Sequence, residues 1–168
     1  HDIPMSAVAE GLAPTKEWKN RVKGEDWVIG DSVNASIGQG FVLASPLQLA
    51  VMTARLATGR AVTPRLIKTI DGVEQPSGAG APMGLNENHL RQIRKGMYEV
   101  VNHGSGTARG SRITSPDHQM AGKTGTSQVI SRRVKCDEVP WRQRDHALFV
   151  NYAPYDNPRI AVSIVVEH

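Results

Sequence analysis

Three strand-like segments in the last third of the chain constrain its fold most. They cover residues 119–130, 146–153 and 159–167, and the last two are rich in β-branched residues, which favour strands. Residues 154–158 read Pro-Tyr-Asp-Asn-Pro, a composition typical of a turn. We therefore expect three strands, with the last two forming a hairpin. Because the strand at 159–167 is almost wholly apolar, we expect it to be covered on both faces. The side chains expected to be mostly buried are Ile160, Val162, Ile164 and Val166.

Two helices are predicted before the strands. Ser45-Pro46 is a favourable helix start, because serine caps the first turn and proline suits the first helical position. The run 47–56 that follows is apolar on nearly all faces, as in a helix buried on several sides. Asn86 is expected to cap an amphipathic helix, and Gly104 to end it in the left-handed conformation. The apolar residues at helical spacing are Leu90, Ile93, Met97, Val100 and Val101.

Before residue 45 the chain is expected to be mostly irregular. A short helix opens at Pro14-Thr15, and a glycine-rich bend is predicted at 38–40. The 168 residues suit one domain or a large part of one, and 39% hydrophobic residues with 21% charged is close to globular usage. The longest apolar run, 160–166, is far short of the ~20 residues of a membrane helix.

The net charge of +4 raises the question of a nucleic-acid partner. The densest basic run, 132–135, is followed at once by Asp137 and Glu138. A solvated loop is therefore the preferred interpretation, and no nucleic-acid partner is expected. Cys136, Asp137 and His146 are conceivable metal ligands, but their spacing fits no standard zinc pattern, so no metal or cofactor is expected.

The most informative stretch is 120–127, which reads Met-Ala-Gly-Lys-Thr-Gly-Thr-Ser. A phosphate-binding loop, Gly-x-x-x-x-Gly-Lys-Thr, would need glycine where this chain has Asp117, and the acidic side chain would repel phosphates. That loop also opens a helix, whereas residues 127–130 continue as strand. A nucleotide-binding domain is therefore a disfavoured alternative.

The second interpretation is the Lys-Thr-Gly element of penicillin-binding proteins and serine β-lactamases, which lies on a strand that lines the active-site groove. Lys123 would supply positive charge and Thr124 a hydroxyl for a substrate carboxylate, while Gly125 allows close approach. The Thr126 N–H would face a developing oxyanion, and its hydroxyl would also reach the carboxylate. Alternation places Thr124 and Thr126 on one side of the strand, so Lys123 must reach around its edge. The alternative to this active-site role is that Lys123 is an exposed strand lysine without a function.

Other segments, in the same order, resemble class B penicillin-binding proteins. Gly38-Gln39-Gly40 followed by Ser45-Pro46-Leu47-Gln48 resembles their Gly-Gln-Gly segment and the helix after it, and 102–108 resembles the helix end before their Lys-Thr-Gly strand. Segments 145–149, 152–154 and 165–168 resemble the next two strands. The nearest resemblance is to the elongation-specific members of that class, through Trp18-Lys19, Asp26-Trp27 and Pro140-Trp141-Arg142.

This resemblance implies an α+β fold, the transpeptidase fold shared with serine β-lactamases. That fold is a five-stranded antiparallel sheet with helices on both faces. Residues 1–168 would be the C-terminal portion of one such domain and would supply its last three strands. The first strands, the nucleophile helix and the closing helix would lie outside the sequence.

The family's nucleophile is a serine with a lysine one helical turn later, because the amine then accepts the hydroxyl proton. No serine of this sequence has a lysine three residues later. The resemblance implies that the nucleophile lies upstream. Ser32-Val33-Asn34 has the spelling of the family's Ser-x-Asn loop, but it directly precedes 38–40, where the family has a lead-in segment. We therefore reject it.

The resemblance implies a peptidoglycan D,D-transpeptidase that acts in cell-wall elongation and cell shape. The implied catalytic residues are Lys123 and Thr126, and the implied substrate-binding residues are Thr124, Gly125 and Thr126. Stem peptides ending in D-Ala-D-Ala and β-lactam antibiotics would bind there. Elongation-complex membrane proteins are the implied partners, and the periplasmic face of the inner membrane is the implied location. The alternative is a catalytically inactive interaction module on the same fold.

Overall fold

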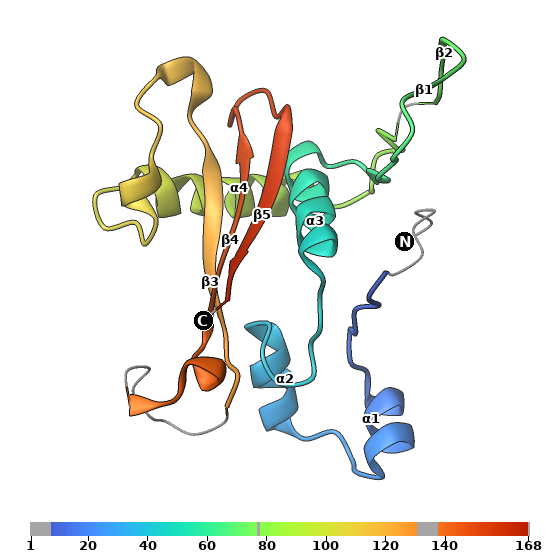
Figure 1. Ribbon diagram of the computed structural model, residues 1–168, viewed down its shortest axis with the longest axis vertical. Helices are drawn as coiled ribbons and strands as arrows, with labels where there is room; N and C mark the ends of the chain where they lie inside the picture. The colour runs from blue at the N-terminus through green and yellow to red at the C-terminus, as the bar shows by residue number, and fades with distance from the viewer. Residues whose placement is uncertain (1–7, 77, 131–137, 168) are drawn as a thin grey trace.

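The computed structural model describes residues 8–76, 78–130 and 138–167 (Figure 1). Within these ranges, a three-stranded antiparallel sheet is packed against two longer helices, and two short helices precede them. The helices are α1 (Lys16–Lys23), α2 (Ile29–Ser36), α3 (Pro46–Thr58) and α4 (Glu87–Asn102). The strands are β1 (Thr69–Ile70), β2 (Val73–Glu74), β3 (Ala121–Ser127), β4 (His146–Ala153) and β5 (Ile160–Val166). No helix in the described ranges is long and apolar enough to cross a membrane.

The main sheet has the order β3-β4-β5 and is antiparallel throughout. The predicted hairpin of β4 and β5 is confirmed, with Phe149 opposite Ile164, and β4 has the predicted bounds. On its other edge β4 pairs with β3, where Phe149 lies opposite Thr124. Strands β1 and β2 form a separate small hairpin. Among the described residues, β3 and β5 each have one edge that pairs with no other strand.

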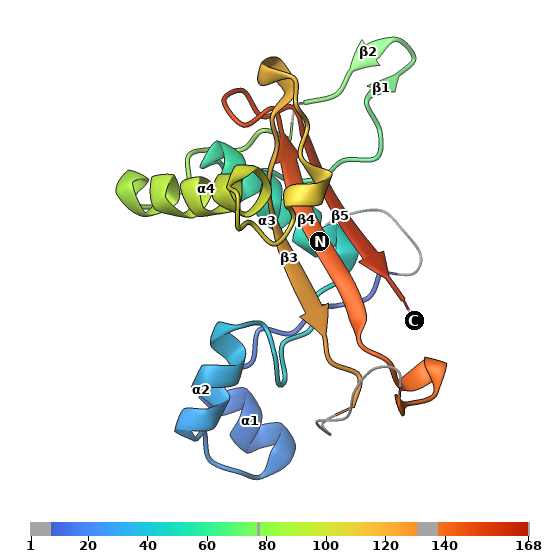
Figure 2. The ribbon, with the colours of Figure 1, turned by 90° about the vertical axis from the view of Figure 1, so that its left-hand side faces the viewer.

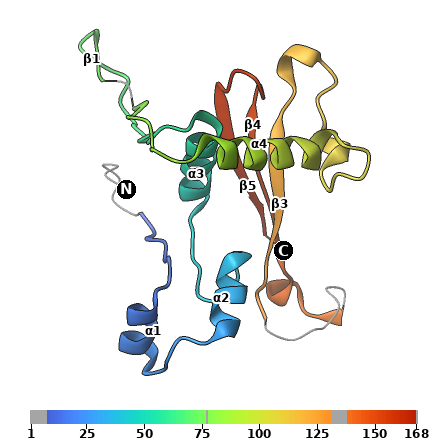
Figure 3. The same ribbon diagram turned by 180° about the vertical axis from the view of Figure 1, so that it is seen from behind.

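Helices α3 and α4 pack against one face of the sheet, which we call the helix face. Figure 3 shows α4 lying across the strands, with α3 beside β5. The core between them contains Ala57 of α3, Met97 of α4, and the paired residues Ala121 and Tyr152 of β3 and β4. Tyr152 and Ala121 have no solvent exposure. The predicted starts of both helices are confirmed, because Ser45 caps α3 and Asn86 caps α4 through their side chains.

Three helix predictions were wrong. Gly104 does not end α4 in the left-handed conformation, because α4 ends at Asn102 and His103 turns the backbone extended, with φ −74° and ψ 154°. Ile93 was expected on the buried face but is 45% exposed. The region expected to be irregular contains α2, which begins where the Asp31 carboxylate accepts a hydrogen bond from the Val28 N–H at 2.8 Å.

The expected burial of β5 was also wrong. Ile160, Ile164 and Val166 are 63%, 46% and 52% exposed, and Val162 is half-buried. Because side chains alternate along a strand, these four residues share one face of β5. This face points away from α3, and we call it the open face. Within the described residues, no helix or strand therefore covers this apolar face of β5. The exposed apolar side chains on this face mark a surface suited to contact with further protein.

A buried ion pair holds α1 against α2. The Lys19 side chain is buried, and its Nζ lies 2.8 Å from Asp31 Oδ2 and donates to the Asp26 carbonyl at 2.9 Å. The hydrogen bond with Asp31 raises the pKa of Lys19. The same bond, together with the Val28 N–H, lowers the pKa of Asp31. Glu25 lies farther away, 3.6 Å from the same Nζ, and its side chain is mostly exposed.

This pair predicts an acid-sensitive α1–α2 unit. Because the folded pKa of Asp31 is lowered, its contribution to stability is present above the ordinary carboxyl pKa of about 4 and is lost as the pH falls through the folded value. Hydrogen-exchange protection of α1 and α2 should therefore fall in acid, and Asp31→Asn should lower it already at neutral pH. Glu25→Gln is the matched control and should change little. Equal protection in wild type and Asp31→Asn at neutral pH would contradict this account.

Candidate active site

The Lys-Thr-Gly triplet lies on β3, one of the two edge strands of the main sheet among the described residues. Figure 2 shows β3 at the border of the sheet, with β4 and β5 on one side of it. Thr124 and Thr126 share the open face of the sheet, and Lys123 projects on the other side of the strand, as alternation predicts. The Lys123 Nζ donates to the Thr124 carbonyl at 2.6 Å. The amine therefore lies against the backbone of its own strand, and its reach around the edge to the side of the threonines stays a prediction.

The exposed part of β3 begins at the triplet. Ala121 and Gly122 are buried, whereas Lys123, Gly125 and Thr126 are exposed and Thr124 is half-buried. Gly122 is packed so closely that a Cβ there would lie 2.7 Å from the Val150 carbonyl oxygen. The first half of β3 is thus fixed in the core, and the second half presents its edge and its threonines to solvent. This arrangement is able to receive an extended peptide.

A residue that sequence reasoning did not assign, Thr107, holds the Thr124 hydroxyl. The two Oγ1 atoms lie 2.9 Å apart. Thr107 follows Gly106, where a Cβ would lie 2.3 Å from the Val100 carbonyl oxygen. Only glycine therefore lets the segment after α4 pack this tightly and bring Thr107 over β3. The small residues of segment 104–108 indicated close packing, but they did not indicate the contact between Thr107 and Thr124.

The bond between the two threonines predicts a modest positioning effect. Thr107→Val removes the partner of the Thr124 hydroxyl at nearly constant volume, so that hydroxyl is no longer oriented. If the full-length protein reacts with penicillin as the sequence resemblance implies, this acylation should slow about two- to tenfold, the size of one hydrogen bond. The exposed Thr114, in the loop before β3, provides the control variant Thr114→Val. An unchanged rate in Thr107→Val would show that this bond has no role.

A second unassigned residue, Gln39, reaches the same strand from the bend after α2. Its Nε2 donates to the Thr126 carbonyl at 2.8 Å, across 87 residues of sequence. The rejected Ser32-Val33-Asn34 segment lies within α2, where Ser32 Oγ accepts a hydrogen bond from Trp27 Nε1. No hydrogen bond found between described residues joins Asn34 to Lys123. The segment was expected to be irregular and is helical, and its rejection as the family's Ser-x-Asn loop stays a prediction.

The conceivable metal ligands are only partly described. Cys136 and Asp137 lie outside the described residues, and His146 begins β4 opposite Ser127. Across residues 8–76, 78–130 and 138–167, no group of three or more His, Cys, Asp or Glu side chains is arranged to hold a metal ion.

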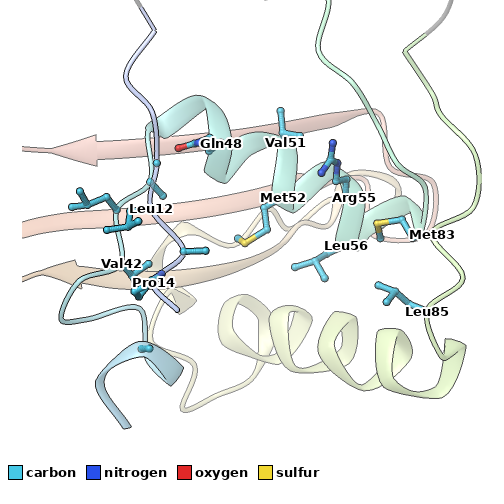
Figure 4. A pocket seen from close by; sticks show the side chains of 15 residues that line it. Leu12, Pro14, Val42, Gln48, Val51, Met52, Arg55, Leu56, Met83 and Leu85 are labelled. Atoms are coloured by element: carbon cyan, nitrogen blue, oxygen red, sulfur yellow. The ribbon is translucent and has the colours of Figure 1, made fainter. Parts of the chain in front are cut away.

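A large hollow among the described residues lies away from β3. Figure 4 shows it between α3, the N-terminal segment and the chain around Met83 and Leu85, with a volume of about 870 Å³. Its lining is mostly apolar, and its two polar side chains are already engaged. Gln48 accepts from the Ser45 N–H, and Arg55 donates to the Val62 carbonyl. We therefore place the candidate active site at the edge of β3 and not in this hollow.

Comparison with known proteins identifies the class. A family model described as the penicillin binding protein transpeptidase domain matches residues 7–168. The chain belongs to this family, and its α+β architecture with an antiparallel sheet is that of the family's fold. The expected likeness to the elongation-specific branch, penicillin-binding protein 2, is also confirmed by the relatives described next.

Two curated relatives are peptidoglycan D,D-transpeptidases named MrdA. The protein from Acinetobacter baumannii is 39% identical over 99% of this chain and 26% of its own length. The protein from Escherichia coli is 30% identical over 99% of this chain and 28% of its own length. The chain thus spans about a quarter of the length of these relatives.

Two solved structures share the fold closely. Penicillin-binding protein 2 from Helicobacter pylori, in complex with MreC, has a TM-score of 0.81 and 36% identity over 99% of this chain and 29% of its own. Penicillin-binding protein 2 from Pseudomonas aeruginosa, in complex with WCK 5153, has a TM-score of 0.78 and 40% identity over 97% of this chain and 34% of its own.

Proposed function

We propose that the protein containing this chain is a peptidoglycan D,D-transpeptidase of cell-wall elongation. The observation on which the proposal depends is the free edge of β3, along which Lys123, Thr124, Gly125 and Thr126 lie with little cover. An extended stem peptide that ends in D-Ala-D-Ala would add to this edge as a further strand. Lys123 and the Thr124 and Thr126 hydroxyls would bind its terminal carboxylate, and Gly125 would leave room for its backbone.

The proposed reaction has two acyl transfers. A serine hydroxyl attacks the carbonyl carbon between the two D-Ala residues, its proton passes to an adjacent base, and the terminal D-Ala leaves with a proton on its amine. An amine of a second stem peptide then attacks the carbonyl carbon of the resulting ester. The new amide bond forms, the bond from the acyl carbon to the serine oxygen breaks, and the proton lost by the amine passes through the base to the serine oxygen. In both steps negative charge develops on the carbonyl oxygen, and the Thr126 N–H would donate to it. The positive charge of Lys123 would stabilise the same transition states.

The nucleophilic serine is proposed to come from the part of the protein before residue 1. Since β3 needs its outer edge for substrate, the two remaining strands of the family's sheet would pair with the free edge of β5. They and their helices would then cover the open face of β5, including the exposed Ile160 and Ile164. Residues 1–168 are accordingly proposed to be the C-terminal portion of one transpeptidase domain.

The proposed partners follow from the relatives. The Helicobacter pylori structure contains MreC beside a protein of this family, so partners from the elongation complex are proposed for this protein too. Because cross-linking of peptidoglycan takes place outside the inner membrane, we also propose the periplasmic face of that membrane as its location.

Covalent labelling tests the proposed function. The full-length protein is incubated with a fluorescent penicillin, with and without an excess of unlabelled benzylpenicillin, and examined after denaturation. We expect one stable, competable adduct, mapped by peptide mass to a serine with a lysine three residues later. A folded full-length protein that forms no adduct would favour the alternative, a catalytically inactive module.

A further inference from the structure

The bend after α2 holds Gln39 in a fixed position beside β3. Gly38 and Gly40 flank it with φ values of +74° and +73°, which glycine adopts without strain. The backbone of the bend is tied to the end of α2, because the Gln39 N–H donates to the Asn34 carbonyl at 2.9 Å. This turn directs a half-buried side chain at β3, where Gln39 Nε2 reaches the Thr126 carbonyl at 2.8 Å.

That carbonyl belongs to the edge at which substrate is proposed to bind. Carbonyl directions alternate along a strand, so the Thr124 and Thr126 carbonyls point to the same edge. Both accept hydrogen bonds from side chains of this chain, Thr124 from Lys123 and Thr126 from Gln39. A peptide that adds to this edge places a backbone N–H on one of these oxygens.

We propose that Gln39 is a specificity-determining residue. Its carboxamide N–H occupies the Thr126 carbonyl in the free protein, and an amide N–H of the acyl donor displaces it from that carbonyl. The inference rests on the proposed function. A carboxamide N–H and a peptide N–H are equivalent donors, so the exchange replaces one hydrogen bond by another of the same kind. A donor that offers an amide N–H at this position competes with Gln39, whereas a donor without it leaves Gln39 in place.

The test compares two β-lactams on the full-length protein. Benzylpenicillin has an exocyclic amide N–H next to the reactive ring, and penicillanic acid lacks that amide. The variant Gln39→Leu removes the competing donor at similar size. Gln39→Asn shortens the side chain by one methylene and keeps its polarity, so it tests the same contact if the leucine variant folds poorly. Gln75→Leu is the matched control, since Gln75 also donates to a carbonyl, that of Val73, but in the β1–β2 hairpin.

The expected result is selective. Gln39→Leu and Gln39→Asn should raise the second-order acylation rate of benzylpenicillin about two- to tenfold, the effect of one hydrogen bond, and leave that of penicillanic acid unchanged. Equal changes for both compounds, no change, or slower acylation by benzylpenicillin would overturn the inference while the proposed function stands. Failure of the wild-type protein to react with either compound would overturn the proposed function and this inference with it.

Discussion

Lys123→Ala in the full-length protein is expected to slow β-lactam acylation by about a hundredfold or more while the fold stays nearly intact. The side chain is exposed and projects beside the strand edge, so its loss removes little packing. It does remove a positive charge from the place where we propose that negative charge develops, and such changes commonly cost a few kcal/mol in the transition state. Stopped-flow or gel-based acylation rates, together with thermal unfolding, measure both parts of this expectation.

Lys95→Ala is the matched control for that variant. Lys95 is an exposed lysine of α4 whose Nζ lies 3.8 Å from the Glu99 carboxylate one helical turn later. Removing it takes away the same charge at a distance from β3, and exposed pairs of this kind contribute little to stability. Acylation by Lys95→Ala should therefore match wild type. Equal rates in Lys123→Ala and wild type would refute the role proposed for the triplet.

The second large effect is expected at Tyr152, which lies at the centre of the core. Its ring is fully buried among Ala57, Met97 and Ala121, and it joins the sheet to both α3 and α4. Tyr152→Ala should lower the free energy of unfolding by about 3–5 kcal/mol, as for other buried aromatic residues, and is expected to reduce the folded population strongly. Chemical denaturation of the full-length protein gives the measurement.

Tyr152→Phe separates the ring from the hydroxyl. The buried hydroxyl has no hydrogen-bond partner among the described residues, and burial raises the pKa of Tyr152 to about 12. Leaving such a group unpaired costs about 1–3 kcal/mol, so its removal should leave stability unchanged or raise it. The raised pKa also means that wild-type stability falls as the pH rises from about 10 towards 12. This alkaline loss should be weaker in Tyr152→Phe, and a markedly less stable phenylalanine variant would contradict the account.

The sequence predicted the local elements well where residue type and spacing decide them. The turn at 154–158 between two β-branched runs led directly to the β4–β5 hairpin, and capping residues located the starts of α3 and α4. Helix α2 was missed because it contains Gly30 and Asn34, both weak helix formers, and begins with a valine instead of a capping side chain.

Burial and long-range contacts were harder to predict, for a physical reason. The apolar residues of β5 indicated a covered strand. Whether a face is covered depends on which other elements lie over it, and the sequence of the strand alone does not determine that. The position of the Lys-Thr-Gly triplet on a strand was predicted from its sequence motif, and the sides of its residues from strand alternation. Its neighbours Thr107 and Gln39 were not, because they reach β3 across 17 and 87 residues and no local spacing encodes such contacts.

The most direct test of the central claim is a structure of the full-length protein acylated by benzylpenicillin. We predict that the acyl group lies along the free edge of β3. Its ester carbonyl oxygen should accept a hydrogen bond from the Thr126 N–H, and its carboxylate should contact Lys123 or the Thr124 and Thr126 hydroxyls. Hydrogen bonds of about 2.7–3.2 Å at these positions would confirm the assignment. An adduct bound elsewhere, with the edge of β3 still free or covered by another strand, would contradict it.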